Sequence, residues 1–213
     1  MMMQHSVEEV NWGKSDQPTE EELRLSGGLL VEDWSHARHV THLATQMFQA
    51  THPLHHYGKK ALRLLERAAF LHNTGLMIES RRHHKHSYRL IKETPLPGFT
   101  DEERHEIACI ARYHRRALPS TDHEEYAVLS HSARKRVSTL SAILRVVDAL
   151  DYNHDGRVLN LEAEREHCNE KIWTLRLYIR SLADLDDELE HAHDKSDLFE
   201  KVFNRKLRFV TMP

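Results

Sequence analysis

The chain has 213 residues, a formal net charge of −3 and 39% hydrophobic residues, among them Cys109 and Cys168 as the only cysteines. This composition suits one globular domain, gives no electrostatic argument for binding nucleic acid or a membrane surface, and contains neither a transmembrane run nor a CxxC motif. Because the N-terminus also lacks the features of a signal peptide, we expect a cytoplasmic protein with no membrane and no specific nucleic-acid partner. The unusual number is the 19 histidines.

Residues 1–30 are polar and lack a clear period, so we interpret them as a loose N-terminal arm with one short helix near 20–25. Between residues 31 and 156 the pattern is helical and is interrupted at prolines and glycines. Thr100 and Glu103 form a capping-box pair at the start of one of these helices. The predicted helices span residues 33–50, 58–73, 83–94, 100–116 and 134–152.

The pattern changes after Gly156. Apolar and polar residues alternate over 159–163 and again over 173–179, which predicts two strands. Helical spacing returns between Leu185 and Phe203, and a last short strand begins at Leu207. The fold class that we predict is mainly α: a helical bundle over residues 31–156, followed by a β-β-α-β subdomain over residues 157–213 that packs on it.

Three of the predicted helices place a histidine on their apolar, core-facing stripe. These are His36, His72 and His114. A lone inward histidine is commonly a hydrogen-bonded core residue, so none of the three is informative by itself. Three from separate helices favour a shared site.

Two carboxylates point toward the same interior, because Asp151 lies in the middle of the apolar face of the helix predicted over 134–152 and Asp148 at its edge. A buried carboxylate needs a cation, strong donors or a metal. Two structural explanations stay open: Asp148 pairs with Arg145, or Asp151 caps the helix end near Asn153. Combined with the histidines, the carboxylates favour a shared metal or anion site.

The order of His36, the doublet His72-Asn73 with Gly75, and Asp148 resembles the signature of the HD superfamily of metal-dependent phosphohydrolases. The segments 83–87, 96–99, 112–119 and 148–151 are similar to the C-terminal domain of the exopolyphosphatase/guanosine pentaphosphate phosphohydrolase (Ppx/GppA) family. This resemblance covers about residues 30–213 and implies an HD-type helical bundle with a β-β-α-β tail.

Two departures from the family pattern bear on activity. Full members carry an N-terminal actin-like domain that holds the polyphosphate-hydrolysing centre, and nothing in this sequence resembles it. The doublet also reads His-Asn where the superfamily has His-Asp, and a neutral amide is a poor bridge between two dications. Exopolyphosphatase activity therefore does not carry over from the family.

The resemblance implies one divalent metal, Mn, Fe, Ni or Zn, with the site weakened or lost through Asn73. It assigns the metal to side chains from the motif and from the neighbouring histidine segments. This candidate metal set is His36, His72, Asn73, Asp148, His83, His84 and His114.

Basic residues flank these candidates, and arginine forks bind phosphate oxygens bidentately. The predicted phosphate-binding set is Arg81, Arg82, Lys85, Arg112, Arg115 and Arg116. A further basic run, Arg134-Lys135-Arg136, binds phosphate or is a solvated surface. For proton transfer we assign His114 and His84 as the catalytic candidates.

These observations leave three hypotheses. The first is a phosphohydrolase acting on a nucleotide, a phosphate ester or polyphosphate. The second is a module that binds polyphosphate or a nucleotide without turnover. The third is a domain that forms a homodimer or docks on a separate catalytic subunit, with Phe70 as an exposed apolar contact. The histidines outside the candidate site are expected to be exposed, namely His5, His52, His55, His56, His191 and His193.

Overall fold

The computed structural model describes residues 19–180 and 184–212. Its helices are α1 (Glu20–Ser26), α2 (Trp34–Ala50), α3 (His52–His55), α4 (Lys59–Leu71), α5 (His83–Glu93), α6 (Asp101–Arg112), α7 (Glu124–Ala127), α8 (His131–Ala149), α9 (Asp186–Asp194) and α10 (Asp197–Phe203), with 3-10 turns η1 (Thr74–Met77) and η2 (Arg165–His167). The strands are β1 (Val158–Ala163), β2 (Ile172–Ile179) and β3 (Lys206–Met212). None of the described helices combines the length and the apolar character needed to cross a membrane.

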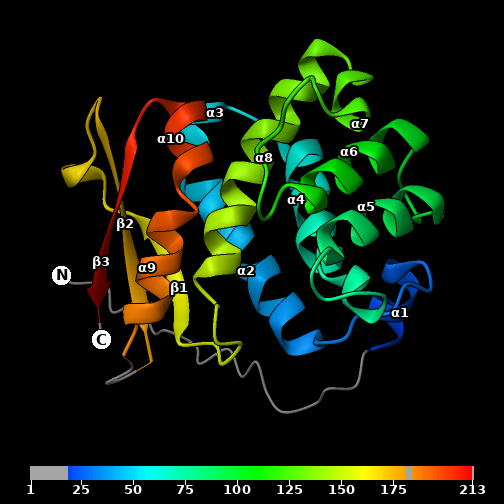
Figure 1. Ribbon diagram of the computed structural model, residues 1–213. Coiled ribbons are helices and arrows are strands. Elements are labelled where there is room, and N and C mark those ends of the chain that lie inside the picture. The colour runs from blue at the N-terminus through cyan, green and yellow to red at the C-terminus, as the bar shows by residue number, and fades with distance from the viewer. Residues whose placement is uncertain (1–18, 181–183, 213) are drawn as a thin grey trace.

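Helix α8 is the centre of the molecule (Figure 1). It packs against α2, α4 and α6 of the helical bundle and against α9 and α10 of the C-terminal part. Val137, Leu140, Leu144 and Val147 along α8 are fully buried, and burial of this face supplies the apolar contact that holds the two parts together. As a result, the C-terminal end of α8 lies beside the first turn of α2 and the end of α4.

The sheet has the strand order β1-β2-β3, with β1 and β2 antiparallel and β2 and β3 parallel. Parallel neighbours need a crossover connection, and α9 and α10 supply it. Because α2 packs against β1 and both crossover helices pack against α8, the sheet lies against the helical bundle (Figure 1).

The mainly helical fold with a small sheet is confirmed, as is the short helix predicted near residues 20–25. The prediction of a single helix between the last two strands is wrong, because α9 ends at Asp194 and α10 begins at Asp197. Between them the Ser196 hydroxyl donates to the carbonyl of Ala192, and the Asp197 carboxylate accepts from the amide of Leu198. Such side chains compete with the helical ladder and end it. The tail therefore has the order β-β-α-α-β.

Three helices of the bundle end at least two residues earlier than their sequence pattern indicates. Helix α4 ends at Leu71, α6 at Arg112 and α8 at Ala149. His72, His114 and Asp151 consequently lie in the segments that follow, yet all three are buried. The short helices α3 and α7 were not predicted. Of the first 30 residues, 1–18, which include His5, fall outside the described part of the chain.

The environments of two further predicted surface residues differ from expectation. Phe70 is half-buried and its ring packs against Trp34, with 5.6 Å between the ring centroids, so it is not a free apolar contact. His55 is half-buried because its Nε2 contacts the carbonyl of Phe48 at 3.0 Å.

The motif glycine Gly75 lets η1 pass close to α5. A Cβ at this position would lie 2.2 Å from the carbonyl oxygen of His83 and 2.5 Å from the amide of Ser87. We predict that Gly75→Ala lowers the free energy of unfolding by about 2–3 kcal/mol, since backbone atoms have to move. The matched control is Gly58→Ala, where a Cβ meets nothing within 4 Å. Urea unfolding of both variants measures the effect, and equal losses would contradict this explanation.

Candidate metal and phosphate site

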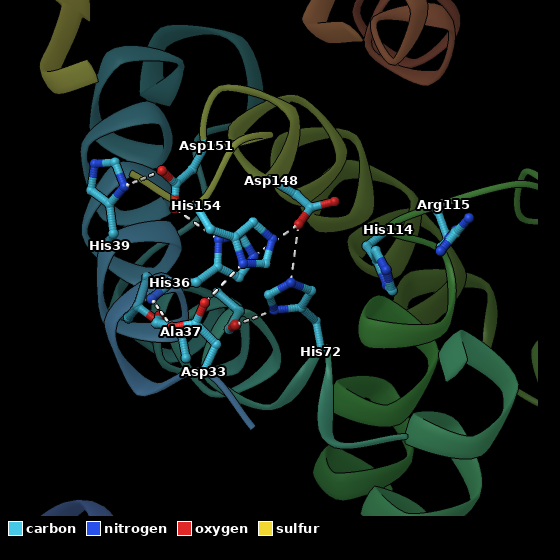
Figure 2. Close-up of polar contacts among 12 residues, drawn as sticks. Asp33, His36, Ala37, His39, His72, His114, Arg115, Asp148, Asp151 and His154 are labelled. Carbon is cyan, nitrogen blue, oxygen red and sulfur yellow. Dashed lines mark hydrogen bonds and ion pairs between the residues drawn. The ribbon is translucent and has the colours of Figure 1, made fainter. Parts of the chain in front are cut away.

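Three helix ends bring His36, His72 and Asp148 together (Figure 2). His36 lies in the first turn of α2, His72 directly follows α4, and Asp148 lies in the last turn of α8. One possible ligand atom from each residue lies within 4.8 Å of the other two. The sequence predicted this set, and helical phase places all three side chains on the inner face.

Each imidazole is oriented by a hydrogen bond through its Nδ1 atom. His72 Nδ1 donates to the carbonyl of Ala69 at 2.6 Å, and His36 Nδ1 lies 2.7 Å from the Asp151 carboxylate. Both Nε2 atoms therefore face Asp148 Oδ1, at 3.0 Å from His72 and 3.4 Å from His36. Orientation of a histidine by a carboxylate or carbonyl behind it is typical of metal-ligating imidazoles.

Asp151 has its own set of partners, which replaces the predicted cap near Asn153. Besides His36, it contacts His39 Nδ1 at 3.1 Å and accepts from the amide of Gly156 at 2.9 Å. The alternative pair of Asp148 with Arg145 is also absent from the described contacts, because Arg145 binds Asp197 at 2.9 Å.

His36 neutralises part of the negative charge of the cluster. Although burial by itself lowers the pKa of this imidazole, the adjacent carboxylates of Asp148 and Asp151 raise it to about 9. Burial likewise opposes ionisation of Asp148, and the adjacent His36 and His72 rings hold its pKa well below the usual range. Without a cation, His36 is therefore an imidazolium between two carboxylates.

The three residues fit one divalent ion. Ligands about 2.0–2.2 Å from a common ion lie about 3.0–3.5 Å apart, and the Nε2–Oδ1 separations of 3.0 and 3.4 Å fall in this range. Asn73 Oδ1 adds a buried oxygen that has no hydrogen-bond partner among the described residues. An amide oxygen suits one ion and not a bridge between two.

A cavity of about 450 Å³ opens beside this cluster. Asn73, Asp148 and the predicted residues His83, His114 and Arg115 line it. Sequence reasoning missed four further titratable side chains in the lining, Tyr152, His154, His191 and Lys195. They come from the turn after α8 and from α9 and its C-terminal end, and no local pattern marked them as parts of a site. His191 was expected to be exposed and is half-buried.

His83 and His114 form a second imidazole pair, with 3.0 Å between their Nε2 atoms. His114 Nδ1 donates to the carbonyl of Ala111 at 2.6 Å, so its Nε2 carries the lone pair. Burial lowers the pKa of His83 to about 4 and that of His114 well below its usual value. Both rings are neutral near pH 7. Because His83 Nδ1 donates to the carbonyl of Ser80 at 2.9 Å, its Nε2 also carries a lone pair, and the two Nε2 atoms face each other as acceptors.

His154 covers the outer side of His36. The two rings stack with 3.6 Å between centroids and an interplanar angle of 2°. The Nδ1 atom of His154 lies 2.8 Å from the carboxylate of Asp33, which also caps α2. The unusual positive φ of 55° at His154 is part of this arrangement.

The remaining predicted site residues do not line the cavity. His84 is buried, and desolvation lowers its pKa to about 4. Arg112 forms an ion pair with Glu125. The other four predicted phosphate ligands are exposed on the surface, namely Arg81, Arg82, Lys85 and Arg116.

Comparison with known proteins places this geometry in a wider context. Residues 30–193 match the family model described as Ppx/GppA phosphatase, domain III. The chain is 30% identical over 121 residues to a guanosine-5'-triphosphate,3'-diphosphate pyrophosphatase of Photobacterium profundum, covering 57% of this chain and 24% of that protein. It is 40% identical over 77 residues to the protein of the same name from Vibrio cholerae, covering 36% and 15%. The chain thus spans a quarter or less of the curated relatives that it matches.

The raised pKa of His36 predicts a pH effect on stability in the presence of EDTA. The folded-state pKa of about 9 lies above the unfolded value of 6.5, so the contribution of His36 is complete below pH 6.5 and is lost as the pH rises toward 9. We expect the stability difference between wild type and His36→Gln to shrink over this interval in urea unfolding. His52→Gln, on the exposed side of α3, is the control. A difference that is the same at pH 6 and pH 9 would refute the imidazolium.

Proposed function

Since the chain belongs to the Ppx/GppA phosphatase domain III family, we propose that it acts on or binds a phosphate-rich ligand at an HD-type site. The ligand is a nucleotide, a phosphate ester or polyphosphate. One observation supports this most: a single cavity joins the acidic and imidazole groups around Asp148 to the cationic side chains of Arg115 and Lys195. The named activity of the relatives concerns a guanosine nucleotide with two phosphate chains, which is a ligand of this class.

In this proposal Arg115 and Lys195 hold the phosphate oxygens. Both side chains are half-buried, and within the described part of the chain neither pairs with a carboxylate. Burial lowers the pKa of each group, which marks the energetic cost of leaving these cations without an anion. A planar guanidinium and an ammonium together bind adjacent oxygens of a phosphate chain.

His36, His72 and Asp148 would hold one divalent ion, with the Asn73 amide oxygen as a further ligand. Such an ion acts as a Lewis acid on a phosphoryl oxygen and offsets negative charge on the phosphate. Asp151 and the Ala69 carbonyl keep the two Nε2 atoms turned toward the ligand. Mn, Fe, Ni or Zn suits this mixture of imidazole and carboxylate.

We assign proton transfer to His83 and His114, because both line the cavity. The acceptor atom of His114 is Nε2, and His83 Nε2 lies 3.0 Å from it. Since both rings are neutral near pH 7, a proton taken up at one Nε2 is shared with the other.

A second function, binding without turnover, is favoured by Asn73. The neutral amide leaves the anion-binding side chains in place and removes a carboxylate that would strengthen a cation site. On this alternative, the chain presents a polyphosphate or a nucleotide to a separate catalytic subunit, or works as a homodimer. Phosphate release by the metal-loaded protein separates the two functions.

We predict that wild-type protein binds Mn²⁺ weakly and that Asn73→Asp binds it at least tenfold more tightly, because the substitution adds an anionic ligand. Isothermal titration calorimetry measures the affinity, and Asn204→Asp, exposed beyond α10, controls for added charge. His36→Ala should abolish binding. Failure of both wild type and Asn73→Asp to bind millimolar Mn²⁺ would exclude the metal-dependent enzyme.

The proposed binding of phosphate by Arg115 and Lys195 is tested in the absence of a metal ion. We expect Arg115→Gln and Lys195→Gln each to weaken binding of tripolyphosphate and of guanosine 5'-triphosphate 3'-diphosphate about tenfold in EDTA, a loss of about 1.4 kcal/mol. The neighbouring Arg116→Gln, which lies outside the cavity, should change affinity less than twofold. Similar losses in all three variants would show a nonspecific charge effect and contradict the assignment.

A further inference from the structure

Helices α3, α7 and α10 lie near the N-terminal end of α8, opposite the end that bears Asp148 (Figure 1). Residues of α7, α8 and α10 and of the segment that contains α3 line a second cavity there. Its volume is about 480 Å³, within the size range of small-molecule pockets. Arg134 in this cavity precedes Asp148 by 14 residues on the same helix, which at the helical rise corresponds to about 21 Å. It is therefore separate from the candidate metal and phosphate site.

The three cations of the basic run at the start of α8 have different environments. Arg136 is neutralised by Glu106, with contacts of 2.7 and 2.6 Å. Arg134 and Lys135 both line the cavity, and among the described residues no carboxylate pairs with either of them. A solvated surface run of charges would not be expected to place its two unpaired cations, Arg134 and Lys135, together in a cavity.

The position of these cations in the helix is itself unfavourable. The first turn of α8 contains no acidic residue, and its first residue is His131, which also lines the cavity. The N-terminal end of a helix disfavours cations and attracts anions. The peptide dipoles and the Arg134 and Lys135 side chains therefore all favour an anion here.

Aromatic side chains also line the cavity, namely Tyr57, Tyr126 and Phe203, and both Tyr126 and Phe203 are buried. The Tyr126 hydroxyl is already engaged with Ser138 and with the carbonyl of Arg134. Tyr126 therefore contributes ring atoms to the cavity, and the same ring also packs edge-on against Tyr113, with 5.9 Å between centroids. Rings of this kind pack against a planar or apolar body.

From this juxtaposition we propose a second ligand site, which takes a small organic phosphate or phosphonate with a planar ring. The anionic group binds Arg134 and Lys135 at the start of α8, and the ring packs against aromatic side chains of the lining, Tyr57, Tyr126 and Phe203. A free phosphate would contact only the two cations, and a neutral aromatic compound would contact only the aromatic side chains.

The test uses the full chain in EDTA and three probes: benzylphosphonate, methylphosphonate and benzyl alcohol. The carbon–phosphorus bond of the phosphonates prevents hydrolysis. We expect saturable binding of benzylphosphonate, with amide shift changes at Tyr57 and Tyr126 in NMR spectra, and at least tenfold weaker binding of each other probe. Absence of saturation by benzylphosphonate, or equal affinity for methylphosphonate, would overturn the proposal.

Two variants probe the cavity independently. Arg134→Gln combined with Lys135→Gln should weaken benzylphosphonate binding at least tenfold, whereas Lys206→Gln with Arg208→Gln, two exposed cations on β3, should change it less than twofold. Thr121→Trp, at the exposed rim, should block the cavity while both cations remain. Binding unaffected by either cavity variant would overturn the proposal.

Arg115→Gln should leave binding here unchanged, so that failure of this site and failure of the proposed function are distinguishable.

Discussion

The ionised carboxylate of Asp148 at the end of α8 is the constraint on which the candidate site depends. Burial of a carboxylate is costly without partners. Asp148 is half-buried and lines the cavity, and its partners come from two other helices, as His36 on α2 and His72 after α4. Packing of α2 and α4 against α8 is thus coupled to charge neutralisation. A shift of any one of these helices would separate Asp148 from an imidazole that compensates it.

The C-terminal ends of α4 and α6 fix the orientation of two histidine rings. His72 and His114 each lie three residues beyond an alanine whose carbonyl, in the last turn of α4 or α6, has no partner within the helical ladder. Each imidazole satisfies that carbonyl through Nδ1 and presents Nε2 to the interior. The same local device therefore fixes the direction of both rings, and it works because α4 and α6 end where they do.

Helical periodicity was sufficient to place His36, His72 and Asp148 on one interior face, because all three lie within or directly after long amphipathic helices. It also placed His114 inward, although for a different reason: α6 ends at Arg112, and the Ala111 carbonyl turns the ring inward instead. Lys195, Tyr152 and His154 could not be found in this way. Their positions depend on how the turns after α8 and α9 pack, and a turn has no period that reports its tertiary neighbours. The division of the tail helix at Ser196 likewise depends on side-chain contacts that spacing does not encode.

The balance of charge around Asp148 explains why one asparagine matters so much. In the absence of a cation, the His36 proton already neutralises part of the charge of Asp148 and Asp151, so a metal ion has to displace that proton in order to bind. An aspartate at position 73 would add negative charge and favour the ion in this competition. Asn73 adds none, while Arg115 and Lys195 continue to contribute positive charge to the cavity. In the proposed function, Asn73 therefore weakens the cation-binding side of the site and leaves the anion-binding side chains in place, so hydrolysis would depend on how much the bound phosphate itself helps to hold the cation.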